Sequence, residues 1–226
     1  MTIWITRTRP GADRTAARLA EAALEVLVDP VLEVRPLPAS TDLSGFAGLA
    51  FSSPNGVDAF AAVNRERALP TFAVGDATAE ALAHHGFSQI RNARGDVAAL
   101  ARRIGEEAGG RVLYLSPAEP SADLVNLVAP YGVAMEARPV YETVPVVPAQ
   151  ALRTAGLTAA LIHSARAGRV VSEVAGDRLG DLDILALSEA CAAPFSDGTV
   201  RSIRVAPFPD DASLVRLTVD TLSKAR

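Results

Sequence analysis

The strongest constraint on the fold is that the chain repeats its own pattern of segments. An apolar segment, a helical stretch and a proline-bounded apolar segment occupy residues 4–36, and the same succession returns at 113–141. A second kind of unit holds two apolar segments that end in small or hydroxyl residues. It occurs at 49–79 and again at 161–191. Two copies of a strand–turn–helix unit predict two similar lobes with a cleft between them, and ligands bind in clefts.

The composition sets the class of protein and excludes several functions. With 226 residues, of which 49% are hydrophobic, the chain is long enough to bury one or two full cores. A net charge of −4 and an isoelectric point near 5.4 argue against nucleic acid as the partner, because phosphate binding needs a basic surface. Cys191 is the only cysteine, which rules out an intrachain disulfide and a cysteine-based metal cluster.

The apolar runs indicate where the protein works. The N-terminal segment reaches Arg7 and Arg9 after a few apolar residues, which is too short for the hydrophobic core of a signal peptide. No apolar run approaches the roughly 20 residues that a membrane-spanning helix needs. We therefore expect a soluble, cytoplasmic protein that has no membrane partner. Its expected partner is a small molecule, and its expected state is a monomer.

Short apolar segments alternate with longer, alanine-rich stretches of helical period. Strands that are apolar throughout and separated by helices are typical of a parallel sheet covered on both faces. The sequence therefore predicts an α/β protein with two similar flavodoxin-like lobes, each a parallel sheet flanked by helices. The expected strands are 3–6, 49–52, 71–74, 112–115, 159–163, 184–187 and 203–205. The expected helices are 13–23, 56–63, 78–84, 97–107, 122–128, 167–174 and 212–222.

Two proline-marked segments, 35–38 and 143–148, interrupt this alternation. Proline favours extended chain because it lacks a backbone donor and fixes its own φ angle. Each segment follows a unit of the first kind, and these equivalent positions favour two extended crossings between the lobes. The alternative is a pair of edge strands within one domain.

A recurring feature is an apolar strand that ends at a small hydroxyl residue just before a helix. The segment 52–54 (Ser-Ser-Pro) predicts a hydroxyl N-cap with proline at the first helical position, and 116–117 (Ser-Pro) predicts the same arrangement. Gly75 marks a tight strand-to-helix turn, where the backbone can approach a ligand closely. Ser164 and Ser188 occupy the corresponding positions in the second copy.

Helix starts of this kind can bind anions. Each leaves several backbone N–H groups unpaired and carries a partial positive charge. In parallel sheets these turns gather where the strands end, so several of them facing one cleft would bind a molecule with many carboxylates without a basic surface. The alternative for any single turn is that the hydroxyl only caps its helix.

Other familiar sites lack their sequence signals. Neither the glycine-rich dinucleotide motif nor a Walker-type phosphate loop occurs. His84 and His85 are expected at a helix end, and His163 is expected half-buried at the end of a strand. None of the three makes a metal-spaced pair with a carboxylate. Cys191 has no assignable base nearby and is interpreted as a small hydrophobic residue.

Four segments stand out by their order and spacing: 8–10 (Thr-Arg-Pro), 51–57 (Phe-Ser-Ser-Pro-Asn-Gly-Val), 74–79 (Val-Gly-Asp-Ala-Thr-Ala) and 139–143 (Pro-Val-Tyr-Glu-Thr). Together they resemble the uroporphyrinogen-III synthase family over essentially the whole chain. The resemblance implies a chain that starts in one lobe, crosses to build the second and then crosses back. The implied parts are a first lobe of 1–36 with 145–226, an inserted second lobe of 37–144, and crossings near 35–38 and 141–148.

The resemblance also implies a reaction. Its substrate is hydroxymethylbilane, a linear tetrapyrrole with eight carboxylates. The enzyme would expel the terminal hydroxyl as water, invert the last pyrrole ring through a spiro intermediate and close the macrocycle to uroporphyrinogen III. Neither a metal nor an organic cofactor is implied, and the enzyme that precedes it in the pathway is a candidate for transient contact.

The resemblance assigns residues to the site as well. Tyr141 matches the family's cleft tyrosine and would donate a proton or hydrogen bond to the departing hydroxyl; the alternative is that it only packs between the lobes. Arg9 would pair with a substrate carboxylate, or would be a solvated residue near a helix start. The expected substrate-binding residues in the turns are Ser52, Ser53, Gly75, Thr78, Ser116, Ser164 and Ser188.

The second copy departs from the family pattern. His163-Ser164-Ala165-Arg166 stands where the family has a hydroxyl residue followed by proline, and Ser188 and Cys191 stand where it has glycine and threonine. Arg166 is then a substitute anchor or a surface residue. Two other functions therefore stay open: a non-catalytic two-lobed module that binds a polycarboxylate or small anion, and an isolated flavodoxin-like interaction domain.

Overall fold

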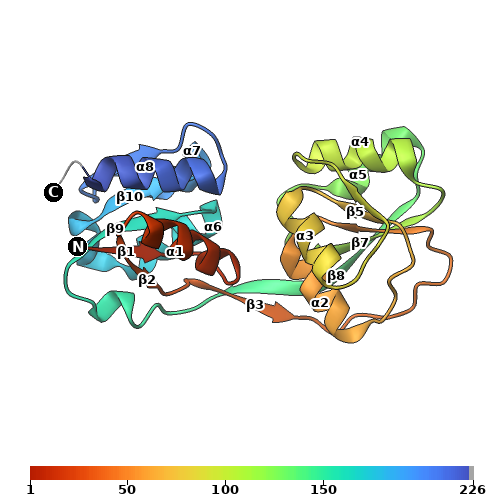
Figure 1. Ribbon diagram of the computed structural model, residues 1–226, viewed down its shortest axis with the longest axis horizontal. Helices are drawn as coiled ribbons and strands as arrows, with labels where there is room; N and C mark the ends of the chain where they lie inside the picture. The colour runs from red at the N-terminus through yellow and green to blue at the C-terminus, as the bar shows by residue number, and fades with distance from the viewer. Residues whose placement is uncertain (224–226) are drawn as a thin grey trace. The chain divides into compact units, whose positions relative to one another are not determined.

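The computed structural model describes residues 1–223, and the chain forms two compact units. Unit 1 comprises Met1–Glu33 together with the chain from Val144 onward, and unit 2 comprises Val34–Thr143. Unit 1 is therefore built from both ends of the chain, with unit 2 inserted between them (Figure 1).

Unit 1 is a five-stranded parallel sheet in the order β11-β10-β9-β1-β2, with helices on both faces. Its strands are β1 (Thr2–Ile5), β2 (Glu25–Val28), β9 (Leu157–Ile162), β10 (Asp183–Ala186) and β11 (Ser202–Val205). Its α-helices are α1 (Gly11–Glu21), α6 (Ala165–Val174), α7 (Glu189–Ala192) and α8 (Asp211–Ser223). The side chains of α1 and α8 fill one core layer, and those of α6 and α7 fill the other.

The central strand β1 shows why this sheet is covered on both faces. All four of its residues are buried. Trp4 points into the layer with α6, whereas Ile3 and Ile5 point into the layer with α1. A strand that is apolar throughout can be stable only when both of its faces are covered.

Unit 2 has a six-stranded sheet in the order β3-β8-β7-β4-β5-β6. Its strands are β3 (Leu32–Pro36), β4 (Gly48–Phe51), β5 (Thr71–Ala73), β6 (Ile90–Asn92), β7 (Val112–Pro117) and β8 (Met135–Pro145). Its α-helices are α2 (Pro54–Val63), α3 (Asp76–His84), α4 (Val97–Glu107) and α5 (Leu124–Val128). Helices α2 and α3 cover one face, and α4 and α5 cover the other (Figure 1).

Four short 3-10 helices complete the described secondary structure. They are η1 (Ala129–Tyr131), η2 (Ala151–Arg153), η3 (Gly176–Asp181) and η4 (Ala193–Phe195).

The predicted α/β class, with parallel sheets flanked by helices, is confirmed. Each expected strand and helix is present within a few residues of its predicted bounds. The sequence did not indicate β2 or β6. Their residues include charged or polar side chains such as Glu25, Arg91 and Asn92, and their burial is partial, so the apolar signal of a central strand is missing.

The two proline-marked segments overlap the ends of β3 and β8, which lie next to each other in the sheet order. The chain passes from one unit to the other inside these strands, at 33–34 and at 143–144. The N–H of Leu37 donates to the carbonyl of Val140 at 2.9 Å, and that of Val146 donates to Val31 at 2.9 Å. The two connections are thus neighbouring strands of one sheet: β3 lies at its edge, and β8 lies between β3 and β7.

The strand order reverses once in each sheet, and this fixes where a ligand would bind. In unit 1, β1 continues through α1 to β2 on one side, whereas its neighbour β9 continues through α6 to β10 on the other. In unit 2 the same reversal separates β4 from β7. Open parallel sheets bind ligands at such switch points, beyond the carboxyl ends of the strands. We call this border of each sheet its carboxyl edge.

Candidate functional site

The switch point of unit 2 begins with two serines that follow β4. Ser53 is the N-cap of α2: its hydroxyl accepts a hydrogen bond from the N–H of Asn55 at 3.2 Å, and Pro54 opens the helix. The predicted capping arrangement is confirmed here. The proline loses nothing at this position because its missing N–H would have no helical partner.

Ser52 connects the two strands that flank this switch point. Its hydroxyl lies 2.6 Å from the phenol oxygen of Tyr114, which comes from β7. Tyr114 is 3% exposed, and burial raises the pKa of its phenol, with the Ser52 hydrogen bond opposing the shift. The phenol therefore stays neutral at physiological pH and offers a hydrogen bond without a charge.

Tyr141 lies on β8, opposite Pro117 of β7, and packs in the core layer with α2 and α3, whereas Tyr114 packs in the layer with α4 and α5. It is 5% exposed, and its ring packs near Gly56, where an added Cβ would be 3.5 Å from Cε1. Burial raises the pKa of Tyr141, and a side-chain hydrogen bond with Ser53 lowers it in part. Two neutral phenols and two serine hydroxyls therefore lie close together at this edge.

The turn after β5 also has the predicted form. Gly75 is the N-cap of α3, and the N–H of Thr78 donates to its carbonyl at 3.1 Å. A Cβ at position 75 would meet only the carbonyl oxygen of Gly95, at 3.9 Å, so the backbone is open on that side. Thr78 itself is only 2% exposed, which places its hydroxyl inside the unit and not at its surface.

The prediction that Ser116 and Pro117 open a helix is wrong. Both residues belong to β7, which pairs with β8 as far as Pro117, and Ser116 is only 2% exposed. The next helix, α5, begins at Leu124 and is capped by Asp123. β7 stays paired with the long strand β8 as far as Pro117, and Ser116 is buried there. These hydrogen bonds between the strands outweigh the local tendency of Ser-Pro to start a helix.

In unit 1 the two predicted serines differ. Ser164 caps α6 by accepting a hydrogen bond from the N–H of Ala167 at 3.1 Å. Ser188 occupies the N-cap position of α7 but makes no side-chain cap; its hydroxyl donates to the sulfur of Cys191 at 3.2 Å. Helix α7 is four residues long, so few of its amides are aligned.

Cys191 is 4% exposed and lies in the core layer with α6, which agrees with its interpretation as a small hydrophobic residue. Residues 1–223 contain no group of three or more His, Cys, Asp or Glu side chains that could hold a metal ion. No helix in this described part of the chain is both long and apolar enough to cross a bilayer.

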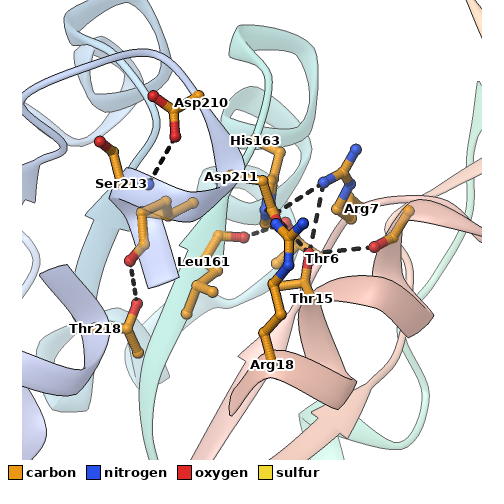
Figure 2. A network of polar contacts seen from close by, with 12 residues as sticks. Thr6, Arg7, Thr15, Arg18, Leu161, His163, Asp210, Asp211, Ser213 and Thr218 are labelled. Carbon is orange, nitrogen blue, oxygen red and sulfur yellow. Dashed lines mark hydrogen bonds and ion pairs between the residues drawn. The ribbon is translucent and has the colours of Figure 1, made fainter. Parts of the chain in front are cut away.

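Arg7 and Arg9 lie close together in the sequence but have different partners. Arg9 is exposed and forms an ion pair with Asp13, four residues later at the start of α1. Arg7, two residues beyond the end of β1, donates to Oδ1 of Asp211 at 3.0 Å. Figure 2 shows that Arg7, Arg18 and His163 converge on Asp211, the first residue of α8.

Asp211 accepts four hydrogen bonds. Its Oδ1 receives them from Arg7, from the hydroxyl of Thr15 at 2.6 Å and from Nε2 of His163 at 3.1 Å. Its Oδ2 receives one from Arg18 at 2.6 Å. These donors hold the pKa of Asp211 well below its usual value, although burial opposes them. The carboxylate therefore stays ionised at any physiological pH.

His163 takes part in this network as a neutral ring. Its side chain is 6% exposed, which is more buried than predicted, and this burial lowers the pKa of the imidazole. Because Nε2 faces a carboxylate that can only accept, we assign the proton to Nε2. Nδ1 is then a buried acceptor without a hydrogen-bond partner.

The remaining histidines lie at the end of α3, as predicted. His85 occupies the C-cap position, and its N–H donates to the carbonyl of Ala81 at 3.0 Å. Its Nε2 lies 2.8 Å from a carboxylate oxygen of Asp58. His84 and His85 therefore lie at the C-terminal end of α3 in unit 2, away from the residues at the switch point.

Sequence reasoning missed Tyr114 and the network around Asp211. Arg7 and Asp211 are separated by 204 positions in the chain, so no local motif links them. Topology brings them together, because the first and last helices of unit 1 lie on the same face of one sheet. The single local signal is that Arg7 and His163 each follow a strand of the switch-point pair.

Comparisons with known proteins agree with this architecture. The family model described as "Uroporphyrinogen-III synthase HemD" matches residues 13–216. A crystal structure of uroporphyrinogen-III synthetase from Helicobacter pylori is similar with a TM-score of 0.72 and 16% identity, covering 97% of this chain and 98% of that one. A uroporphyrinogen III synthase mutant from Thermus thermophilus is similar with a TM-score of 0.58 and 16% identity, covering 99% of each chain.

No curated protein sequence matches the chain. The two solved structures establish the fold, and the family model covers most of the sequence. On that match, this chain belongs to the uroporphyrinogen-III synthase family.

Proposed function

We propose that this chain is an active uroporphyrinogen-III synthase, a cyclising lyase of haem biosynthesis. It removes water from hydroxymethylbilane and closes the ring with inversion of the terminal pyrrole. The observation that carries the proposal, beyond family membership, is the neutral hydroxyl cluster at the switch point of unit 2: Ser52, Ser53, Tyr114 and Tyr141.

Tyr141 is the proposed proton or hydrogen-bond donor. The terminal hydroxyl leaves as water and must gain a proton in doing so, and a phenol can supply a hydrogen bond to it. Because burial raises the pKa of Tyr141, the phenol stays protonated, and the Ser53 hydroxyl beside it only partly offsets that rise. A phenol is a weak acid near neutral pH, so its contribution is about tenfold to a hundredfold.

The conformation of the substrate matters more than acid strength. Unguided closure of the linear chain joins the ends without inverting the last ring, so the enzyme must hold the reacting ends in one geometry. The helix starts at Ser53, Gly75 and Ser164 offer backbone N–H groups to carboxylates without bringing a charge.

The other predicted substrate residues act less directly in this proposal. Thr78 and Ser116 are buried within unit 2, so they support the turns from behind. Ser188 contributes its backbone at the start of the short α7, and Arg9 would have to release Asp13 to meet a carboxylate. We further propose that the protein works as a cytoplasmic monomer and makes transient contact with the preceding enzyme of the pathway.

The departures at His163, Ser188 and Cys191 do not remove the unit 1 turns. Ser164 still caps its helix without the family's proline, so the amides of α6 remain at the carboxyl edge. Nothing in the fold or in the comparisons favours the non-catalytic binding module over the enzyme.

The test is an isomer-resolved assay. Purified protein is incubated with freshly made hydroxymethylbilane, the product is oxidised, and isomers I and III are separated by chromatography. We expect isomer III well above a control without protein. Isomer I alone, from protein that is folded by circular dichroism, would reject the enzyme and leave the binding module.

A further inference from the structure

We propose that Arg7 binds a carboxylate of the tetrapyrrole substrate and that Asp211 is the residue that positions it. This inference rests on the proposed function, since it assigns an anchor within that substrate site. It concerns unit 1 alone and replaces the expectation that attached this role to Arg9.

The first argument is the place of Arg7 in the sheet. It lies two residues beyond β1, and His163 comes directly after β9, so both border the pair of strands at which the order of the sheet reverses. Ligands of open parallel sheets bind at this point, beyond the carboxyl ends of the strands. Arg7 is therefore the guanidinium nearest in sequence and topology to where a ligand of unit 1 is expected.

The second argument is that the guanidinium is held in one place. It bonds to Asp211 on one side and lies against the backbone of Gly11 on the other. A Cβ added at Gly11 would be 2.6 Å from both Nε and Nη2 of Arg7, so only glycine leaves room for this position. A preorganised planar fork loses little entropy when it binds a carboxylate through two hydrogen bonds.

The third argument is the balance of charge. Arg7 lies within electrostatic range of Arg14 and Arg18 and of one carboxylate, Asp211. Arg7 and Arg18 both bond to this one carboxylate, and Arg14 adds a third positive charge near Arg7, in a chain whose net charge is −4. Asp211 already accepts four hydrogen bonds, so the surplus positive charge is available to an anion from outside.

The fourth argument is access. The side chain of Arg7 is 30% exposed and that of Arg18 is 49% exposed, whereas Asp211 is 20% exposed and His163 is 6% exposed. The cations thus reach solvent, and the groups that orient them lie behind. A molecule with many carboxylates meets the guanidinium side of this network first.

The test compares binding with turnover. The variants are Arg7→Gln, Arg7→Lys and Asp211→Asn, and the controls are Arg204→Gln on exposed β11 and Asp210→Ser. Asp210 accepts from the N–H of Ser213 at 2.7 Å, a cap that serine can replace, so this control changes the charge by the same amount at the same helix start. The readouts are KM and kcat for isomer III, and the Kd of uroporphyrin III, the oxidised product, by its own fluorescence.

For Arg7→Gln we expect KM and Kd to rise about tenfold with kcat changed less than about threefold, and for Arg7→Lys a smaller rise. Asp211→Asn should weaken binding as well, although it makes the chain more positive. Pure charge attraction predicts the opposite sign, so tighter binding by Asp211→Asn would overturn the positioning role. Equal effects of Arg7→Gln and Arg204→Gln would overturn the carboxylate site.

Two further results separate this inference from the proposed function. If the wild type makes isomer III and Arg7→Gln binds and turns over normally, the inference fails while the function stands. If the wild type makes none, yet binds uroporphyrin III in a manner that Arg7→Gln weakens, the carboxylate site stands and the enzyme proposal fails. A changed emission of the buried Trp4 would show that Asp211→Asn does not fold. In that case Arg7→Gln and Arg7→Lys alone decide whether the carboxylate site exists.

Discussion

The carboxyl edges of the two units have the same topology but different chemistry. At the switch point of unit 2, two serines and two phenols form a neutral hydrogen-bonded cluster. At that of unit 1, two arginines, Arg7 and Arg18, and a neutral histidine contact one carboxylate, that of Asp211. One repeated strand–turn–helix pattern is thus joined to two different sets of side chains. We propose that the neutral edge carries the chemical step and that the charged edge adds a guanidinium to the backbone N–H groups that both edges offer to carboxylates.

The two units also carry separate spectroscopic reporters. Trp4 is the chain's only tryptophan and lies in the core of unit 1, whereas all three tyrosines, Tyr114, Tyr131 and Tyr141, lie in unit 2. Tryptophan emission and the near-ultraviolet circular dichroism of tyrosine therefore follow the units one at a time. The stability predictions below use these two reporters.

The largest effect is expected at acid pH, where unit 1 should unfold before unit 2. The pKa of Asp211 is lowered by its donors, and a carboxyl whose folded pKa is depressed stabilises the fold above its unfolded pKa of about 3.9 and loses that stabilisation as the pH falls. The pKa of His163 is lowered by burial, so unit 1 also loses stability as the pH falls below about 6.5. Arg7 and Arg18 contact Asp211, Arg7 also acts on His163, and Arg14 lies within electrostatic range of Arg7.

The measurement is urea unfolding followed by both reporters between about pH 7 and pH 3. As the pH is lowered, the urea midpoint from tryptophan should begin to fall at a higher pH than the midpoint from tyrosine. Asp211→Asn should be less stable than the wild type at neutral pH, but its stability should depend less on acid. In unit 2 the pKa of Asp42 is also lowered, by Ser44, but that side chain is exposed and contributes little. Parallel loss of both signals would contradict the comparison.

Tyr141→Phe should lower kcat by about tenfold to a hundredfold, with KM changed less than about twofold. The ring still packs against Gly56, and only the hydrogen-bonding oxygen is lost. Tyr131→Phe is the matched control, because that ring is 47% exposed and lies in η1. An unchanged kcat would reduce Tyr141 to a packing residue.

Gly168→Ala in α6 should destabilise unit 1 by about 1–2 kcal/mol, because clashes of this size exceed the gain in helix propensity. Its added Cβ would be 2.8 Å from the carbonyl oxygen of Cys191. Gly56→Ala in α2 should have a smaller effect on unit 2, since its Cβ would be 3.0 Å from the carbonyl oxygen of Leu115. The urea midpoint from tryptophan measures the stability lost by Gly168→Ala, and the midpoint from tyrosine measures that lost by Gly56→Ala. A larger loss of stability in Gly56→Ala would contradict the expected order.

The smallest effects concern the two serines of unit 1. Ser164→Ala removes a cap and should lower stability by about 1 kcal/mol, whereas Ser188→Ala removes no cap and should stay within about 0.5 kcal/mol. Tryptophan-monitored unfolding distinguishes them. Equal losses would show that the Ser188 contact with Cys191 is worth as much as a cap.

Much of the fold followed from the sequence because its signals are local. The all-apolar strands, the alanine-rich helices and the Ser-Pro start of α2 each depend on neighbouring residues alone. Ser116 failed because a distant strand, β8, extends the pairing of β7 past the local signal. The sequence showed that hydroxyls precede helices, but it could not separate a hydroxyl that caps, such as Ser164, from one that does not, such as Ser188.

The site was less predictable, since its charged half depends on contacts across the whole chain. Arg7 and Arg9 have the same local setting in the sequence, and only the position of α8 distinguishes them. Tyr114 was missed because its sequence context indicates only a strand residue. Its hydrogen bond to Ser52 forms because β4 and β7 are paired in the sheet.

The division of tasks between the two edges can be measured most directly by steady-state kinetics of isomer III formation for wild type, Tyr141→Phe and Arg7→Lys side by side. The account predicts a lower kcat and a nearly unchanged KM for Tyr141→Phe. It predicts a higher KM and a nearly unchanged kcat for Arg7→Lys. If both variants lose kcat alone, or both gain KM alone, the two edges do the same work and the account is wrong.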